Sequence, residues 1–114
     1  MAVFLVPPRL APIVFTGGTR AGLRAQAICS LEEGDPPIVM RWLKDGSELL
    51  ESLDKELHIS QVNEFTSILV IRAAREDHSG GYSCTAANLA RTATVATHLS
   101  ISGTQWYATQ TPLQ

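Results

Sequence analysis

The stretch Gly-Gly-Tyr-Ser-Cys-Thr-Ala-Ala-Asn, residues 80–88, decides the fold of this chain. Its residues alternate, so that Tyr82 and Cys84 share one face of an extended strand while small and polar residues occupy the other. A second cysteine, Cys29, and a tryptophan, Trp42, stand in similar alternating segments upstream. Two strand-centre cysteines on either side of an indole, with a tyrosine just before the second, are typical of a sandwich of two β-sheets.

Other segments of the chain repeat this period of two. Alternating residues occupy positions 23–29, 38–42 and 95–101, and turn-forming glycine, proline, asparagine and aspartate separate the segments at short intervals. A helical pattern competes only over residues 48–57, where the Asp-Gly dipeptide at 45–46 and the strand-like segment that follows favour a turn and an irregular strand. We therefore predict an all-β sandwich or barrel.

Size and composition restrict the classes of function. The 114 residues suffice for one domain with a buried core, and 45% hydrophobic against 18% charged residues indicates a folded chain. The formal net charge of −2 and the scattered lysines and arginines argue against nucleic acid as a partner. The apolar run over residues 1–6 is far shorter than the ~20 residues of a membrane span, so we expect no membrane insertion by this segment.

The chain from about Pro8 to Ile101 resembles immunoglobulin domains. Residues 84–88, Cys-Thr-Ala-Ala-Asn, resemble the C-x-A-x-N signature of the intermediate set, and residues 42–46, Trp-Leu-Lys-Asp-Gly, resemble the exit of its third strand. The family's pattern through its fifth and sixth strands matches Leu69, Ile71, Ala74, Gly80, Tyr82 and Cys84.

Within this family, one group of receptors is similar in detail. Residues 6–12, 33–38 and 78–84 look like a variable N-terminal-type domain of the arthropod Dscam receptors, above all of the shortened Dscam proteins of chelicerates. This resemblance implies a domain drawn from an alternatively spliced set. It also implies that like domains pair in antiparallel fashion through the A-B-E-D sheet, named by the family's strand letters.

The resemblance implies a disulfide between Cys29 and Cys84 that joins the two sheets, whereas two cysteines without this context could be free thiols. The bridge would stabilise the fold by about 4 kcal/mol in the chain-entropy model and would indicate an oxidising, extracellular compartment. The core residues that the resemblance assigns are Trp42, Tyr82, Leu69 and Ile71. The predicted organisation is an N-terminal extension over residues 1–7, an immunoglobulin-like domain over 8–102 and a C-terminal tail or linker over 103–114.

Two positions depart from the family's pattern. His78 stands four residues before Tyr82, where the family usually has an aspartate paired with a basic residue near the fourth strand, and Asp77 lies one place earlier. Arg91 stands seven residues after Cys84, where the family often has a glycine with positive φ. The first departure puts the family's ion pair in question, and the second predicts an altered F–G loop.

The sequence contains no motif for catalysis or for a cofactor. His58, His78 and His98 lack the spacing that would place two metal ligands on one face. The acidic loop at residues 32–35 is followed by two prolines and lacks the alternating oxygen ligands of a calcium loop. A nucleophile elbow and a phosphate-binding loop are also missing from the sequence. We therefore expect no enzyme activity, no cofactor and no metal site.

Strand parity predicts which side chains reach the surface. If Cys29 points inward, its neighbours along the second strand point outward, and the same rule applies to the fourth and fifth strands. If Leu57 and Ile59 of the fourth strand face inward, the residues that parity places on the outer face of the A-B-E-D sheet are Arg24, Gln26, Ile28, His58, Ser60, Ile68, Val70 and Arg72. Residues 13–20 of the first strand would border this face. Ile28, Ile68 and Val70 would form an apolar patch of a kind that monomers normally avoid.

Two interpretations of this patch stay open. The first is a homophilic interface in an extracellular recognition domain, which would be part of the ectodomain of a single-pass cell-surface adhesion receptor. Its partners would be a second copy, in an antiparallel homodimer between cells, and neighbouring immunoglobulin domains of the same receptor. The second is that β-branched residues are tolerated on any strand face or are covered by a following domain. The chain would then be a structural spacer in a multi-domain matrix or muscle protein, whose cysteines could stay reduced.

Overall fold

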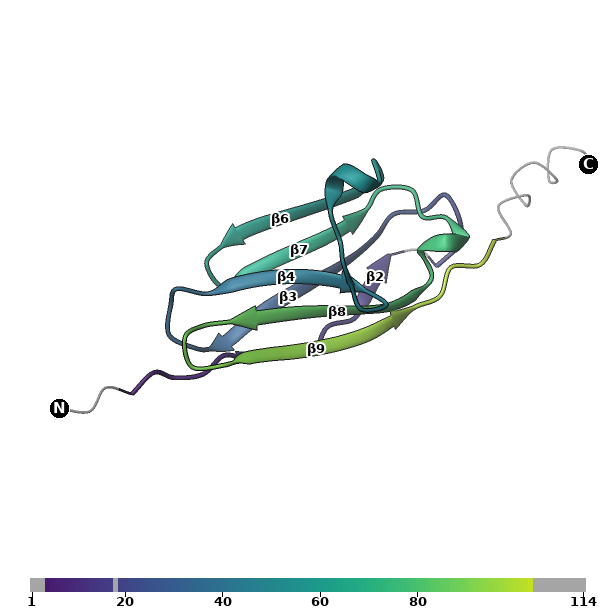
Figure 1. Ribbon diagram of the computed structural model, residues 1–114. Coiled ribbons are helices and arrows are strands. Elements are labelled where there is room, and N and C mark those ends of the chain that lie inside the picture. Colours follow the sequence, from purple (N-terminus) through teal and green to yellow (C-terminus); the bar gives the residue numbers. More distant parts are fainter. Residues whose placement is uncertain (1–3, 18, 104–114) are drawn as a thin grey trace, which may run out of the picture.

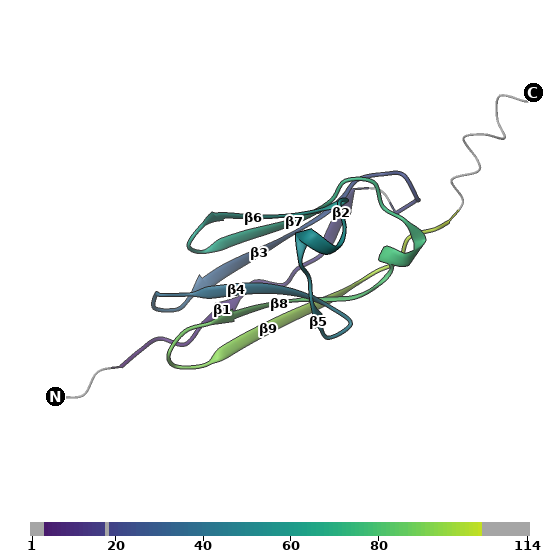
Figure 2. The same ribbon diagram turned by 45° about the horizontal axis from the view of Figure 1, so that its top comes forward.

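The computed structural model describes residues 4–17 and 19–103, and these form two antiparallel sheets packed face to face (Figure 1). The first sheet is five-stranded, in the order β1-β3-β7-β6, with β2 also paired to β3. The second is four-stranded, in the order β5-β4-β8-β9. Figure 2 shows the two sheets as separate layers. The prediction of an all-β, immunoglobulin-like sandwich is therefore confirmed.

The strands are β1 (Arg9–Leu10), β2 (Phe15–Gly17), β3 (Ala25–Glu33), β4 (Val39–Lys44), β5 (Ser47–Glu48), β6 (Leu57–Asn63), β7 (Thr66–Ile71), β8 (Gly80–Ala87) and β9 (Thr92–Leu99). Two short 3-10 helices, η1 (Glu51–Leu53) and η2 (Glu76–His78), precede β6 and β8. In the family's lettering β1 and β2 are strand A, β3 is B, β6 is D and β7 is E. No helix in the described part of the chain is long and apolar enough to cross a membrane. Parts of the predicted extension and tail, residues 1–3 and 104–114, lie outside the described residues.

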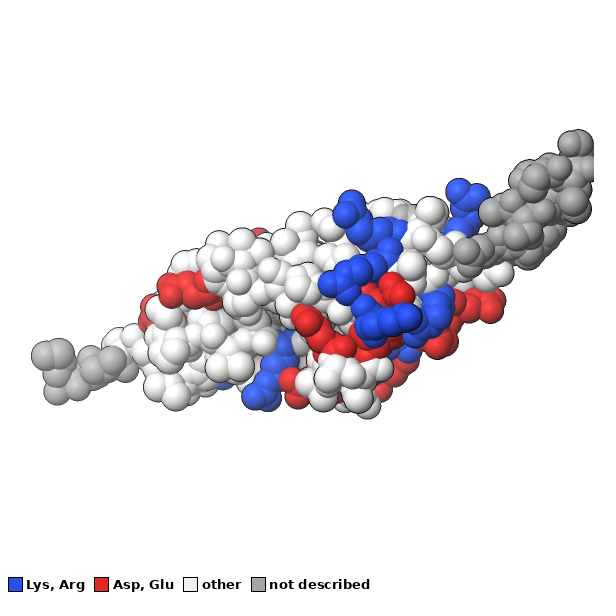
Figure 3. Space-filling view, turned by 90° about the horizontal axis from the view of Figure 1, so that it is seen from above, with Lys and Arg blue, Asp and Glu red and all other residues white. Residues whose placement is uncertain are grey.

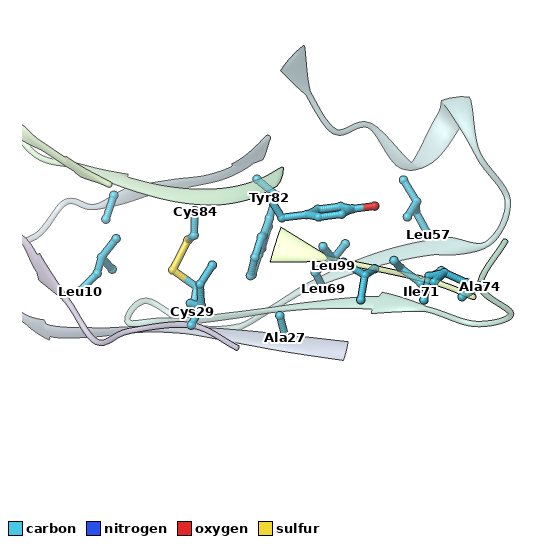
Figure 4. Close-up of a cluster of buried hydrophobic side chains, with 14 residues drawn as sticks. Leu10, Ala27, Cys29, Leu57, Leu69, Ile71, Ala74, Tyr82, Cys84 and Leu99 are labelled. Carbon is cyan, nitrogen blue, oxygen red and sulfur yellow. A yellow bond between two sulfur atoms is a disulfide. The ribbon is translucent and has the colours of Figure 1, made fainter. Parts of the chain in front are cut away.

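The core forms where the inward faces of the two sheets meet. β3 and β7 pair so that Ala27 lies beside Leu69, and both side chains are buried, as the period of two requires. Cys29 of β3 forms a disulfide with Cys84 of β8, which links the two sheets within the apolar cluster, toward its Leu10 end (Figure 4). Ile71 is also fully buried in this cluster. Burying each large aliphatic side chain stabilises the fold by roughly 1.5–3 kcal/mol.

Trp42 joins the same layer of the core. It lies opposite Cys84 in the pairing of β4 with β8 and is only 2% exposed. Its indole Nε1 donates a hydrogen bond to the hydroxyl of Ser67, 2.9 Å away on the other sheet. Ser67 in turn lies opposite Cys29 in the pairing of β3 with β7. The hydrogen bond and the disulfide therefore cross the sandwich at the same level.

Tyr82 is buried beside the start of β8, and its hydroxyl donates to the main-chain carbonyl of His78. This contact four residues upstream is the geometry of a tyrosine corner. The ring of Phe15, from β2, stands edge-on to the Tyr82 ring, with the centroids 5.0 Å apart. Burial raises the pKa of the Tyr82 hydroxyl well above its usual range. The tyrosine is thus a structural hydrogen-bond donor.

Asn88 closes the turn between β8 and β9. Its side-chain oxygen accepts the amide hydrogens of Ala90 and Arg91, and its side-chain nitrogen donates to the carbonyls of Val6 and Asp35. Arg91 does not have positive φ, because Asp45 is the only non-glycine residue of the described chain that does. A side chain, rather than a glycine, shapes this turn and fixes the incoming N-terminal segment to it.

The segment before β6 differs from the predicted turn and irregular strand. After β5, residues Glu51–Leu53 form one turn of 3-10 helix. The carboxylate of Asp54 then accepts the amide hydrogen of Glu56 at 3.0 Å, and β6 begins at Leu57. Such a side-chain turn lets the chain reverse over few residues, which the helical spacing of the leucines does not reveal.

Candidate interaction face

The outer side of the five-stranded sheet, called here the A-B-E-D face, carries the predicted interface residues in register. The pairing of β3, β7 and β6 places the side chains in two adjacent rows across the sheet. One row is Gln26, Val70 and His58, and the other is Ile28, Ile68 and Ser60. Within each row the residues are direct cross-strand neighbours, whose side chains touch on an antiparallel sheet. Six of the eight predicted residues therefore lie together.

The centre of this face is apolar and partly open to solvent. Ile28 is 44% exposed, whereas Ile68 and Val70 are half-buried. His58 and Ser60 point to the same side, since Leu57 of the same strand is buried in the core. The structure thus fixes the orientation of strand D.

The first strand extends the face beyond β3. Val14 is 65% exposed and, with Pro12 and Thr16, borders a shallow hollow over Gln26, Ile28 and Ser30. Ile13, in contrast, is 4% exposed and belongs to the core. Parity could not separate these residues in advance, because the pairing of the first strand with β3 shifts in register.

Arg24 and Arg72 lie at the same end of the A-B-E-D face, just before β3 and just after β7. Arg24 is exposed and borders a second hollow, in which Gly17 approaches its main-chain carbonyl. Any Cβ at Gly17 would clash with that carbonyl, so a glycine is required there. The guanidinium of Arg72 donates to the carbonyl of Lys55 at 2.8 Å. The two arginines form a basic end of the face.

Acidic side chains occupy the opposite end. Glu64 is exposed in the turn between β6 and β7, and Glu32 is exposed near the end of β3. Arg9 approaches Glu32 at 3.9 Å and Glu33 at 3.2 Å, which neutralises part of this charge. Figure 3, seen from the β6 side, shows a small group of acidic side chains at one end of the molecule, while the other half carries most of the visible basic side chains together with further acidic ones.

His58 lies at the β6 side of the face, beside a carboxylate. Its ring Nδ1 is 3.5 Å from an oxygen of Glu51, and the same oxygen accepts the amide hydrogen of Ile59. The two side chains are about half exposed, so the attraction between them is weak when the imidazole is protonated. The contact nevertheless links η1 to the A-B-E-D face.

The ion pair placed in question by His78 is present with its charges reversed. Asp54, before β6, supplies the acid, and its carboxylate lies 2.7 Å from Arg75 and 2.8 Å from the Nε2 of His78. The Nδ1 of His78 accepts the amide hydrogen of Arg75, so Nε2 carries the proton donated to Asp54. The Arg75 guanidinium holds the pKa of the Asp54 carboxyl well below its usual range, although desolvation opposes this.

The remaining candidate chemistry is not assembled in the described residues. Cys29 and Cys84 are bonded to each other. Across residues 4–17 and 19–103, no group of three or more histidine, cysteine, aspartate or glutamate side chains could hold a metal ion. His58 contacts the carboxylate of Glu51, whereas His78 contacts that of Asp54. The A-B-E-D face, in contrast, brings six of the eight predicted interface residues together.

Comparison with known proteins adds a family and several relatives. The model of the immunoglobulin I-set domain matches residues 8–101. The cell adhesion molecule Dscam2 of Drosophila melanogaster is 36% identical over 84 residues, which cover 74% of this chain and 4% of that protein. Myopalladin of Mus musculus is 34% identical over 97 residues, covering 85% of this chain and 7% of that protein. The chain therefore spans less than a tenth of the length of these relatives.

A solved structure matches over almost its whole length. The crystal structure of the Dscam1 Ig7 domain, isoform 5, superposes with a TM-score of 0.78 at 28% identity, covering 84% of this chain and 97% of that one. This similarity extends over both sheets of the sandwich.

Proposed function

Because this chain belongs to the immunoglobulin I-set family, we propose that it is an extracellular recognition domain of a cell-surface adhesion receptor, and that it binds a second copy of itself through its A-B-E-D face. The observation that carries this proposal is the apolar centre of that face. Ile28, Ile68 and Val70 are cross-strand or next-row neighbours on the solvent side of a sheet. The similarity to Dscam2 supports adhesion as the setting.

The chemistry of the face suits contact with protein. An apolar patch within a polar border loses water favourably when it is covered, at roughly 25 cal/mol per Å² of apolar surface. The sequence has no Asn-x-Ser/Thr site, since Asn63 precedes Glu-Phe and Asn88 precedes Leu-Ala. N-linked glycan therefore does not shield the patch.

The distribution of charge favours an antiparallel pair. Arg24 and Arg72 lie at one end of the face and Glu64 at the other. In an isologous contact each copy presents the same surface, so an antiparallel arrangement brings the basic end of one copy over the acidic end of the other. Glu56 is less suitable as the partner acid, because its carbonyl pairs with the amide of Arg72 at the basic end.

Sedimentation of the chain at low concentrations tests this proposal. We expect a weak dimer, and we expect Ile28→Asp or Val70→Asp to abolish it, because each change puts an unpaired charge at the centre of the contact. Leu89→Asp is the matched control, since Leu89 is 83% exposed but lies in the turn between β8 and β9. A monomeric wild type, or equal effects of all three variants, would refute the proposal.

Display of the domain on beads tests whether the contact can form between opposing surfaces, as it would between two cells. Beads that carry this domain should aggregate with one another, whereas beads that carry the Val70→Asp variant should stay dispersed. Aggregation would support contact between cells, with neighbouring immunoglobulin domains of the receptor holding this domain in position. Dispersed wild-type beads would contradict adhesion in trans.

A second candidate function is that of a structural spacer domain in a multi-domain muscle protein, and the similarity to myopalladin supports it. The two functions differ in their compartment, and thus in the state of Cys29 and Cys84. Titration of free thiols in the natively expressed protein separates them. An intact bridge favours the extracellular receptor, and two free thiols favour the spacer.

A further inference from the structure

The outer edge of β9 has no partner strand in the described part of the chain. β9 is the last strand of its sheet, and Figures 1 and 2 show no strand beyond it. Both parts of the first strand pair with β3 instead, and the amide of Ala11, between them, donates to the carbonyl of Ser30. The bridge from Arg20 to Ser102 lies past the end of β9. A strand of eight residues is thus left with one unpaired edge.

The turn before β9 defines which main-chain groups lie on this edge. The amide of Asn88 donates to the carbonyl of Arg91, so these two residues form a hydrogen-bonded pair of the antiparallel ladder. Such pairs alternate with pairs that do not bond to each other. The residues of β9 whose N–H and C=O groups point away from β8 are therefore Thr92, Thr94, Ala96 and His98. Their side chains are exposed as well.

The other strand edges of this domain are protected in ways that β9 is not. β5 has two residues, and the pairing of β6 is irregular between Gln61 and Asn63. The first strand is divided into β1 and β2, and its register shifts between Arg9 and Leu10. β9, in contrast, keeps an unbroken register, and its sequence Thr-Ala-Thr-Val-Ala-Thr-His-Leu has no proline and no lysine, arginine, aspartate or glutamate. Short or irregular edge strands, prolines and charged side chains are the usual features that prevent edge pairing. β9 lacks them, so its edge can accept an additional strand.

We propose that β9 pairs in antiparallel fashion with β9 of a second copy of this chain, about a two-fold axis at Val95. This register places Thr94 opposite Ala96 and Thr92 opposite His98, and it satisfies every outward N–H and C=O group of the four residues. Shifting the register by two residues leaves some of these groups unpaired. The edge is therefore complementary to itself.

The side chains favour a second copy as the occupant. A strand that pairs with itself brings its own charges together, and β9 contains no lysine, arginine, aspartate or glutamate. Threonine and valine favour the strand conformation, and the small side chains of threonine and alanine can face each other across the two-fold axis without a clash. The contact uses a different surface from the A-B-E-D face, so one copy can make both contacts at once. Two different two-fold contacts build an open row of molecules rather than a closed dimer.

Two double variants test the register. Thr94→Lys with Ala96→Lys places ammonium groups opposite each other twice across the axis, and should weaken the pairing roughly tenfold. Thr94→Lys with Ala96→Glu is the matched control, because each ammonium then faces a carboxylate of the other copy. Both variants change only exposed side chains. Equal association of the two variants would overturn the proposed register.

Sedimentation at high concentrations separates this contact from the A-B-E-D contact. Wild type should form species larger than a dimer, whereas Val70→Asp alone and the double-lysine variant alone should each stop at a dimer. All three substitutions together should give a monomer. The β9 contact is refuted if Val70→Asp stays monomeric, or if the double-lysine variant assembles like wild type. The A-B-E-D contact fails separately, if the double-lysine variant is itself monomeric.

Amide hydrogen exchange gives a second readout. The N–H groups of Thr94 and Ala96 should exchange quickly in dilute protein and slowly in concentrated protein, while those of Ala93 and Val95 stay protected by β8 throughout. An edge that gains protection only from an added foreign peptide, and not from more of the chain itself, would also overturn self-pairing.

Discussion

The indole nitrogen of Trp42 and the hydroxyl of Ser67 form a buried hydrogen bond between the two sheets, beside the disulfide. Ser67 is 2% exposed and is one of two buried polar residues in the described chain. The hydrogen bond that its hydroxyl accepts from Trp42 explains why a serine is present among aliphatic neighbours. A tryptophan N–H that is buried in this way needs an acceptor.

Ser67→Ala should therefore destabilise the domain by about 1–3 kcal/mol, because the Trp42 N–H would be left buried without a partner. Chemical denaturation with the disulfide intact measures the change. Ser60→Ala, on the outer face, is the control and should change the free energy of unfolding by less than about 0.5 kcal/mol. Equal losses from both variants would show that the hydrogen bond has no special importance.

The reversed ion pair predicts a dependence of stability on pH. The pKa of Asp54 is lower in the folded chain than in the unfolded chain, chiefly because of the hydrogen bonds from Arg75. Its contribution is therefore complete above the ordinary aspartate pKa of about 3.9, and it is lost as the pH falls toward the folded value. Asp54→Asn should reduce stability by roughly 1–3 kcal/mol at neutral pH, and by less in acid.

Unfolding in urea at neutral pH and in acid measures this difference. Asp77→Asn is the control, because the Asp77 side chain is 73% exposed although it also contacts Arg75. An exposed pair contributes little, so this variant should behave like wild type. A loss in Asp54→Asn that is the same at both pH values would contradict the role assigned to the carboxylate charge.

Asn88 combines two roles that substitutions can separate. Asn88→Ala removes the acceptor for the turn and the donor for Val6 and Asp35, and should destabilise the domain by about 1–2 kcal/mol. Asn88→Asp keeps the acceptor and loses only the donor. Amide exchange should then stay slow at Ala90 in the aspartate variant and become fast in the alanine variant. Fast exchange in both would show that the turn depends on the donor.

The strands and the face on which each side chain lies could be predicted from the sequence, but the specific contacts between distant side chains could not. The period of two assigned Ile28 and Val70 to one side of a sheet, because a strand offers only two faces. The hydrogen bond between Trp42 and Ser67 forms because two strands that are distant in the sequence meet at the same level of the sandwich. A local sequence pattern does not predict such a contact. The reversal of the ion pair at Asp54 likewise depends on a loop. The edge of β9 is open because both parts of the first strand, β1 and β2, pair with β3 and not with β9.

An exchange of charges tests the antiparallel orientation on the A-B-E-D face. Arg72 follows β7 and Glu64 precedes it, so an antiparallel pair brings Arg72 of one copy toward Glu64 of the other. Arg72→Glu should weaken homophilic binding, because two acidic ends would then meet, and Glu64→Arg should weaken it by placing two basic ends together. Each variant should lose roughly tenfold in affinity.

The two variants mixed together should regain binding, since in the mixed pair each acidic end again meets a basic one. The chain that carries both substitutions should also bind itself. Mixing experiments followed by sedimentation distinguish these cases, with Arg41→Glu on β4 as a control outside the face. Arg72 also donates to the Lys55 carbonyl, so unfolding curves must show that each variant is folded. A mixture that binds no better than its components would exclude the antiparallel arrangement, because only that arrangement brings the two positions together.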